Sequence, residues 1–183
     1  VQGVLEWMLT APQGSVQVAV LRNKSVKPGT LLLEAWYQAT TQAPAGLALD
    51  RVLPAEPLRL LVDNKGRNLA PQVAAASLAK QLDVPENKLA RTVIKAHRDD
   101  AEGLLNGAEK EARVQGAQWL ATAREAWQQL EGSELQRLLA LQAVNPSVRV
   151  SEVEAQRQRV ADGLEALERL QMSLYAVRLI IAA

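Results

Sequence analysis

The hydrophobic positions of the chain repeat first with a period of two, then with a period near 3.6, and finally with a period of two again. Alternation predicts β-strands over three early stretches, Ser15–Arg22, Thr30–Gln38 and Leu58–Asp63. The turn at Lys27-Pro28-Gly29 separates the first two strands, and so short a connection favours antiparallel pairing between them. Leu174–Ala182 alternates as well and is apolar on both faces, which is typical of a strand inside a sheet.

Two shorter elements are predicted outside these strands. Apolar residues at helical spacing predict a helix over Val1–Leu9, which ends before Pro12. Leu47–Leu53 follows a turn and is expected to form a short extra strand.

The middle of the chain is predicted to be helical. A first helix is expected over Val73–Leu82, and Asp83 is a candidate cap for the helix that follows. The apolar side of that second helix consists of Leu89, Val93, Ile94, His97 and Ala101. Gly103 and Gly107 each cost about 1 kcal/mol relative to Ala in a helix interior, so we expect a break or kink there.

The strongest period lies between Ala101 and Met172 and predicts two long amphipathic helices folded back on each other at Asn145-Pro146. The stripe of the first helix comprises Leu105, Ala108, Ala112, Trp119, Ala123, Ala126 and Leu130. Its small residues allow close approach, and Trp127 is expected to fill space elsewhere. Ser151 and Glu154 predict a capping box at the start of the second helix. The stripe of that helix comprises Val153, Val160, Leu164 and Leu167.

This order of strands, helices and a final strand predicts an α+β domain. We expect a central, mostly antiparallel sheet flanked by about four helices, two of them forming an antiparallel, coiled-coil-like hairpin. At about 1.5 Å per residue, the first arm of the hairpin spans roughly 60 Å and the second roughly 30 Å, so the second covers only half of the first. The chain is expected to be a single domain, 1–183, and its start at Val1 suggests a piece of a larger protein.

The composition is that of an ordinary globular protein, with 48% hydrophobic and 22% charged residues and a net charge of +1. A module held on nucleic acid by phosphate contacts is usually far more basic. The absence of Cys excludes disulfides and thiolate metal sites and fits a cytoplasmic, reducing compartment. No apolar run approaches the ~20 residues that span a bilayer, so no membrane contact is expected.

No group of side chains predicts catalysis. His97-Arg98-Asp99-Asp100 contains the one His of the chain, but it lacks the downstream Asn of a kinase catalytic loop and offers too few metal ligands. Gly66-Arg67-Asn68 lacks the Lys and hydroxyl of a phosphate-binding loop. The available acidic pairs, Asp99-Asp100 and Glu109/Glu111, are interpreted as solvated helix faces. We therefore assign no catalytic, cofactor-binding or metal-binding residue.

Two binding roles remain open. Basic residues occupy two predicted loops, one with Arg22, Lys24 and Lys27 and one with Lys65 and Arg67. If these loops converge, they form a basic rim for nucleic acid, although no aromatic side chain for base stacking lies near them in the sequence. The hairpin is either core packing, an arm for a partner protein, or a seam through which the domain associates with itself.

Two stretches carry a resemblance to a known family. The first runs from Arg59 to Val73 and contains Asp63-Asn64-Lys65-Gly66-Arg67-Asn68, and the second runs from Leu139 to Val177 and contains Asn145-Pro146. Together with the ending Leu174–Ile181, they resemble the C-terminal end of the RapA (HepA) family. These are bacterial RNA polymerase-associated recycling ATPases of the SWI/SNF-like helicase superfamily.

The resemblance implies a mainly antiparallel sheet flanked by helices, two of them long and coiled around each other. It also implies a DNA-binding parent hydrolase that uses ATP and magnesium, binds RNA polymerase and recycles it during transcription. No ATPase motif of that family has a position in this chain, so the chain itself is expected to be non-catalytic and without a cofactor. Its implied partners are RNA polymerase and the ATPase domains of the parent, in the bacterial cytoplasm at the nucleoid.

Overall fold

The computed structural model describes residues 16–23 and 25–183, and the helix expected over Val1–Leu9 lies outside them. Contacts along the chain divide it into two compact units. Unit 1 consists of Val1–Gln38, Pro57–Arg113 and Ser173–Ala183, and unit 2 consists of Ala39–Glu56 and Val114–Met172. Three elements contribute residues to both units: β2 (Leu31–Thr40), α4 (Arg98–Trp127) and β5 (Gln171–Ala182).

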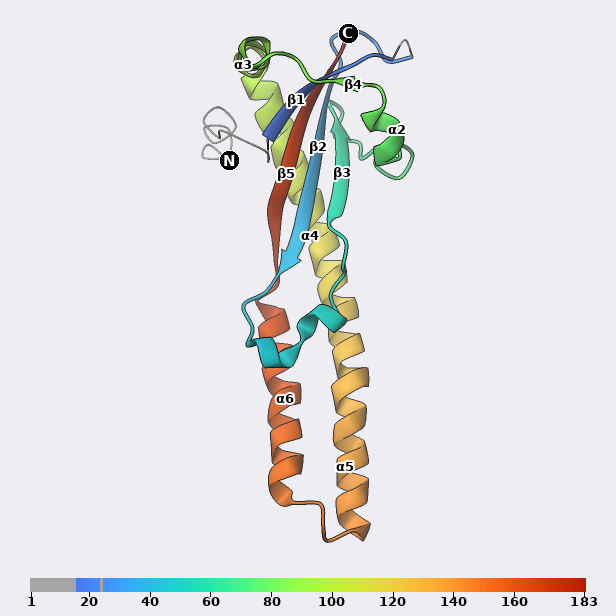
Figure 1. Cartoon of the computed structure of the whole chain (residues 1–183), viewed down its shortest axis with the longest axis vertical. Helices are drawn as coiled ribbons and strands as arrows, with labels where there is room; N and C mark the ends of the chain where they lie inside the picture. The colour runs from blue at the N-terminus through green and yellow to red at the C-terminus, as the bar shows by residue number, and fades with distance from the viewer. Residues whose placement is uncertain (1–15, 24) are drawn as a thin grey trace. The chain divides into compact units, whose positions relative to one another are not determined.

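Five strands of the described chain form one mixed sheet in the order β3-β2-β5-β1-β4 (Figure 1). The remaining bounds are β1 (Val16–Leu21), β3 (Leu58–Asp63) and β4 (Leu82–Asp83). β2 and β3 pair antiparallel, with Leu33 opposite Val62, whereas β1 and β5 pair parallel, with Val18 opposite Leu179. The strands predicted over Ser15–Arg22, Thr30–Gln38, Leu58–Asp63 and Leu174–Ala182 and the α+β class are therefore confirmed.

β5 lies between β1 and β2, as Figure 1 shows. The prediction of a strand inside the sheet is confirmed, and the expected pairing of the first two strands is wrong because β5 separates them. The backbone N–H of Gly29 donates to the Ala182 carbonyl, and the Ala182 N–H donates to Thr30. At the opposite end, the Thr40 hydroxyl donates to the Gln171 carbonyl at 3.4 Å, so β5 runs antiparallel to β2.

The predicted alternation along β2 is confirmed. Leu33, Ala35 and Tyr37 are buried on one face, while Glu34 and Trp36 belong to the other. The face of Glu34 also carries an apolar cluster that includes a residue of the short helix α2 (Ala75–Ala79). The buried members of this cluster are Ala19, Leu21, Leu32, Leu61, Leu78 and Ile180.

α2 is shorter than the predicted Val73–Leu82 helix. Leu82 and Asp83 instead pair antiparallel with the edge of β1 as β4, because a free strand edge offers hydrogen bonds to both residues. The Asp83 carboxylate forms an ion pair with Arg22. The expected cap at Asp83 is therefore wrong, and Glu86 occupies the N-cap position of α3 (Asn87–Ala96).

The helix break falls at His97, between α3 and α4, and not at the two glycines. α4 continues without interruption through Gly103 and Gly107. Leu105 and Ala108 beside them are 1% and 0% exposed. Burial of such a face outweighs the helix cost of about 1 kcal/mol per glycine, so the expected break is wrong.

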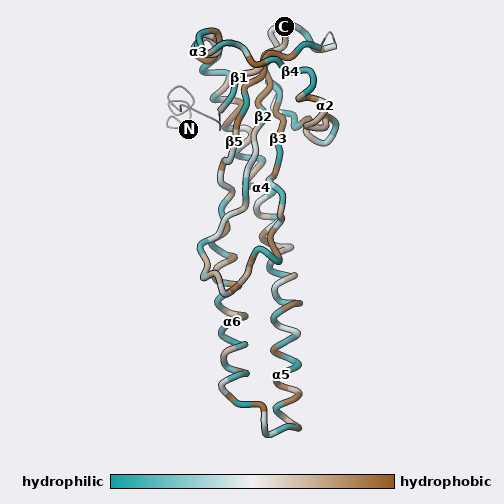
Figure 2. Tube along the Cα trace, viewed as in Figure 1, coloured by the Kyte–Doolittle hydropathy of each residue, from teal (hydrophilic) through white to brown (hydrophobic). Residues whose placement is uncertain are grey.

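Unit 2 contains an antiparallel pair of helices. α4 passes directly into a π-helical segment, η3 (Gln128–Gly132), and then into α5 (Ser133–Val144); α6 (Val150–Glu168) returns after Asn145-Pro146. Figure 2 shows hydrophobic and hydrophilic positions alternating along α5 and α6, as expected of amphipathic helices. Within the described residues, no helix combines the length and apolar character needed to cross a membrane.

Trp127 lies at the centre of this helix pair. Its side chain is 0% exposed, and its indole Nε1 donates to the Val160 carbonyl at 3.1 Å. Four members of the predicted stripe are confirmed as buried, namely Leu105, Ala108, Ala112 and Ala123, but its phase is wrong at the C-terminal end, where it placed Trp127 outside the seam and Leu130 in it. Leu130 is 38% exposed.

Two local predictions in unit 2 are also wrong. The strand expected over Leu47–Leu53 is replaced by two 3-10 turns, η1 (Ala45–Leu47) and η2 (Leu49–Arg51). Ala48 between them has a φ of 51°, a left-handed backbone that an extended strand does not contain. The capping box is absent because α6 begins at Val150, after Arg149, with no side-chain cap bond.

Candidate functional site

A row of polar side chains crosses the sheet on the face that carries Trp36. It consists of Arg59 of β3, Glu34 of β2, Arg178 of β5 and Gln17 of β1. Arg59 Nε donates to Glu34 Oε1 at 2.7 Å, and Arg178 Nη1 donates to Glu34 Oε2 at 3.0 Å. Because Glu34 is 1% exposed, two guanidinium groups replace the water that a carboxylate otherwise requires.

The same row holds Arg178 over the ring of Trp36. Arg178 Nε and Nη2 donate to Gln17 Oε1 at 3.3 and 3.1 Å, and its guanidinium carbon lies 5.7 Å from the indole centroid. This distance allows a cation–π interaction. An aromatic ring and a cation are thus held in fixed positions on the sheet, so little side-chain freedom remains to be lost when a ligand binds there.

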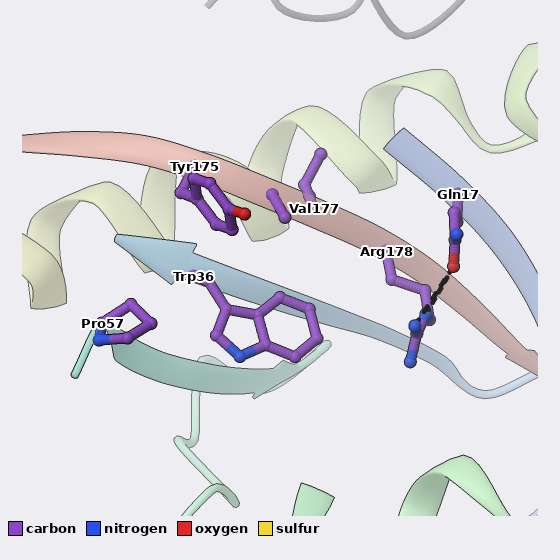
Figure 3. A pocket seen from close by; sticks show the side chains of 7 residues that line it. Gln17, Trp36, Pro57, Tyr175, Val177 and Arg178 are labelled. Carbon is purple, nitrogen blue, oxygen red and sulfur yellow. Dashed lines mark hydrogen bonds between the residues drawn. The ribbon is translucent and has the colours of Figure 1, made fainter. Parts of the chain in front are cut away.

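Trp36 and Arg178 border a hollow of about 290 Å³ in unit 1. Its other lining residues are Gln17, Pro57, Tyr175, Ala176 and Val177. Figure 3 shows the Trp36 indole lying between the Pro57 ring and Arg178, with Tyr175 on the neighbouring strand β5. Tyr175 is 64% exposed. Trp, Tyr and Arg are the residues that most often dominate the binding energy of protein interfaces, so this surface fits a partner protein.

The turn from Asp63 to Asn68, which carries part of the family resemblance, is a structural element. The Asp63 carboxylate accepts hydrogen bonds from the backbone N–H groups of Lys65 and Arg67 at 3.0 and 2.9 Å and from Arg67 Nε at 2.8 Å. Burial opposes ionisation, but these hydrogen bonds together lower the pKa of Asp63 below its usual value. Gly66 adopts a φ of 75°, which glycine tolerates best.

The acidic residues considered in the sequence do not gather into a catalytic group. His97 Nδ1 lies 3.6 Å from the Asp100 carboxylate, and Glu109 lies 3.9 Å from Arg113. Across residues 16–23 and 25–183, no group of three or more His, Cys, Asp or Glu side chains is placed to hold a metal ion. Burial raises the pKa of Tyr37 above its ordinary value, so this hydroxyl stays protonated.

The basic loops are partly neutralised. Arg22 pairs with Asp83 and Arg67 pairs with Asp63. Lys24 lies outside the described residues. The sequence reasoning missed a stronger basic feature, the face of α3, although its Lys and Arg residues recur at helical spacing.

Unit 2 holds a second network of polar groups around Glu131 of η3. Arg159 Nε and Gln156 Nε2 each donate to Glu131 Oε2 at 2.9 Å. Arg159 also donates to the carbonyls of Gly46 and Leu47 at 2.6 and 3.0 Å. The hydrogen bond from Arg159 lowers the pKa of Glu131. This network joins η1, η3 and α6. Its role is structural, since its donors and acceptors bind one another.

Comparison with known proteins identifies the family. Residues 1–182 match the model of the RNA polymerase recycling family C-terminal domain, RapA_C. The chain belongs to this family. The resemblance found in the sequence is therefore confirmed.

The chain is also similar to proteins named RNA polymerase-associated protein RapA. It is 40% identical over 182 residues to the protein of Stutzerimonas stutzeri, 39% to one of Pseudomonas putida and 38% to one of Pseudomonas syringae pv. syringae. These alignments cover 100% of the chain but 19% of each relative. The chain thus spans about a fifth of the length of the curated relatives it matches.

Proposed function

We propose that this chain is a non-catalytic accessory domain of an RNA polymerase-associated recycling ATPase, which it serves by contacting RNA polymerase or by regulating the motor. The observation that carries the proposal is the surface formed by Trp36, Tyr175 and Arg178, in a chain whose relatives are named RNA polymerase-associated. Rigid aromatic side chains beside an immobilised Arg give a protein interface large contact area at low entropic cost.

The chemistry of the chain supports an accessory role. None of the ATP-binding motifs sought in the sequence is present, and Asp63, Arg67, Asp83 and Arg22 are paired with one another. We therefore place ATP and magnesium in the rest of the parent protein and assign no cofactor to this chain. The proposed location is the bacterial cytoplasm, where RNA polymerase is found.

A binding experiment tests the polymerase contact. RNA polymerase is immobilised, and the chain is titrated over it by surface plasmon resonance. Replacing Tyr175 by Ala removes an exposed aromatic from the hollow; the loss typical of an interface hot spot, about 2 kcal/mol, corresponds to roughly 30-fold weaker binding. The matched control is Val144→Ala, which truncates another exposed apolar residue, at the hairpin turn.

The two variants separate the possible contacts. If wild type and Tyr175→Ala bind RNA polymerase equally well, the sheet face is not the contact surface. If only Val144→Ala weakens binding, the hairpin is the contact surface instead. The non-catalytic part is tested separately. The purified chain should not hydrolyse ATP, and turnover that survives controls for contaminating enzymes would contradict it.

A second candidate function is self-association through the end of the hairpin. Apolar side chains are exposed on both sides of its turn, with Leu141 36%, Val144 81% and Val150 69% exposed. Two copies that pack these residues together would remove that surface from water. Light scattering over a range of concentrations tests this: a molecular mass that stays monomeric would contradict self-association.

A further inference from the structure

Helix α3 presents a cationic face. Lys88, Arg91, Thr92 and Lys95 lie within about 100° of the helix circumference, because α-helices turn by 100° per residue. All four side chains are exposed, and they line a shallow hollow of about 390 Å³. Ile94, about 110° around the helix from the centre of this face, is 6% exposed. α3 is therefore anchored by one side and offers the other to a ligand.

The positive charges of this face have no partner among the described residues. The ion pairs of that part of the chain do not include Lys88, Arg91 or Lys95. Arginines elsewhere commonly do pair, as Arg67 and Arg137 show. From Lys88 to Arg98 the sequence contains no Asp or Glu. Ordinary solvated helix faces mix both signs of charge, and this one does not.

Helix stability does not account for this arrangement. The first turn of α3 contains no acidic residue, and Lys88 occupies it. The N-terminal end of a helix carries a partial positive charge, so a cation there is unfavourable by a few tenths of a kcal/mol or more. Only Lys95, in the last turn, has the favourable position. The charge of Lys88 is thus not explained by helix stability, and Arg91, in the middle of the helix, gains nothing from the helix dipole.

We propose that the cationic face of α3 binds the sugar-phosphate backbone of nucleic acid. Phosphate contacts are commonly made by Lys and Arg side chains, of which this face carries three, whereas the Thr92 hydroxyl already donates to the Lys88 carbonyl at 3.0 Å. The centres of protein–protein interfaces are instead rich in aromatic residues and poor in Lys. Lys88 and Lys95 are separated by a rise of about 10 Å, enough to meet successive phosphates. Without an aromatic side chain on this face, binding is independent of base sequence.

This site differs from the basic loops considered in the sequence. Arg22 and Arg67 of those loops already bind carboxylates of their own chain, so they cannot donate fully to phosphate. The proposal is also independent of the polymerase contact, because the Trp36 surface and the α3 face share no residue.

A salt titration tests the proposal. Binding of the 183-residue chain to a fluorescein-labelled, mixed-sequence DNA duplex is measured by fluorescence anisotropy at increasing salt. Each phosphate contact contributes about 0.9 to the slope of log K against log salt, so three contacts give a slope near −2.7. The variant Lys88→Gln/Arg91→Gln/Lys95→Gln should lose most of this slope and bind more than about tenfold more weakly at low salt.

The control variant removes the same charge elsewhere. Lys80→Gln/Lys110→Gln/Arg149→Gln replaces three exposed cations that form no ion pair within residues 25–183, and it should bind like wild type. The charge-keeping variant Lys88→Arg/Arg91→Lys/Lys95→Arg should also retain binding. Absence of binding at low salt, or an equal loss in the control, would overturn the proposal. Poly-glutamate that displaces the labelled DNA more effectively than unlabelled duplex at equal charge would do so too, in favour of an acidic protein.

Discussion

Gly163 of α6 offers the sharpest test of how the helix pair in unit 2 is packed. A Cβ built at this position would meet three atoms of the Trp127 indole well inside the 3.0 Å that real Cβ atoms essentially never cross. The indole has no room to withdraw, because it is 0% exposed and donates to the Val160 carbonyl. The Arg159 guanidinium lies 5.5 Å from its ring centroid. Replacing Gly163 by Ala must therefore displace Trp127 or separate the helices.

Two opposing effects decide the magnitude. Ala is favoured over Gly in a helix interior by about 1 kcal/mol. Overpacking of a well-packed core costs about 1 to 3 kcal/mol, and the upper end applies here because the overlap involves the rigid ring of Trp127. The expected result for Gly163→Ala is a net loss of about 2 kcal/mol in the free energy of unfolding.

The control is the same substitution where space is open. A Cβ at Gly103 of α4 would have no atom within 4 Å, so Gly103→Ala should stabilise the chain by up to about 1 kcal/mol. Urea unfolding is followed by far-UV circular dichroism and by Trp fluorescence. An unfolding midpoint of Gly163→Ala equal to or above that of wild type would refute the packing of Trp127 against α6. The double variant with Trp127→Leu should recover part of the loss, since the pair is in direct contact.

Two further predictions concern buried carboxylates. The hydrogen bond from Arg159 lowers the pKa of Glu131 from its ordinary value. Its stabilising contribution is therefore complete above the unfolded pKa and is lost as the pH falls through the folded pKa. Wild type should therefore lose stability in acid more steeply than Glu131→Gln, and parallel curves would contradict this. Replacing Glu34 by Ala leaves Arg59 and Arg178 without their shared acceptor and should cost about 3 kcal/mol or more. Glu34→Gln keeps an acceptor and should cost less; an unchanged thermal midpoint for the Ala variant would refute the role of the row.

Periodicity located the strands, but it could not determine how they pair. β2, β3 and β5 were predicted close to their observed bounds because alternation is a local property of the sequence. Pairing depends on which strand best fills the space between two others. β5 is apolar on both faces, and that property predicted its internal position, but nothing local showed that it would separate β1 from β2.

The phase of the helix seam failed for a different reason. The predicted stripe continued through Ala126 and Leu130, whereas the structure buries Trp127 and Glu131, each one residue later. The miss begins before the π-helical segment: the predicted stripe took a step of three residues after Ala123, whereas the helix buries Trp127, four residues on. The π-helical segment then starts at Gln128 and changes the number of residues per turn. A carboxylate in the seam is also unexpected from hydrophobicity alone. It is possible here because Arg159 on α6 supplies the opposite charge.

Part of the candidate site was visible in the sequence. Alternation along β2 put Glu34 and Trp36 on one face, away from Leu33 and Ala35. The rest of the site comes from residues far away in the chain, such as Arg178, which the β5 register brings beside them. A contact between positions 34 and 178 depends on the order of the strands, and no local pattern encodes that order.

The two proposed surfaces of unit 1 follow from opposite physical effects, and this difference makes them separable. The hollow beside Trp36 and Tyr175 has a mainly apolar lining, and its one cation, Arg178, already binds Glu34. Binding there is driven by removing apolar surface from water, which salt weakens little. The face of α3 consists of unpaired cations, so binding there depends on the release of counterions and falls steeply as salt rises. A partner that binds both surfaces should therefore lose at high salt only the part of its affinity that depends on Lys88, Arg91 and Lys95. The affinity that remains at high salt should be the part that Tyr175→Ala abolishes.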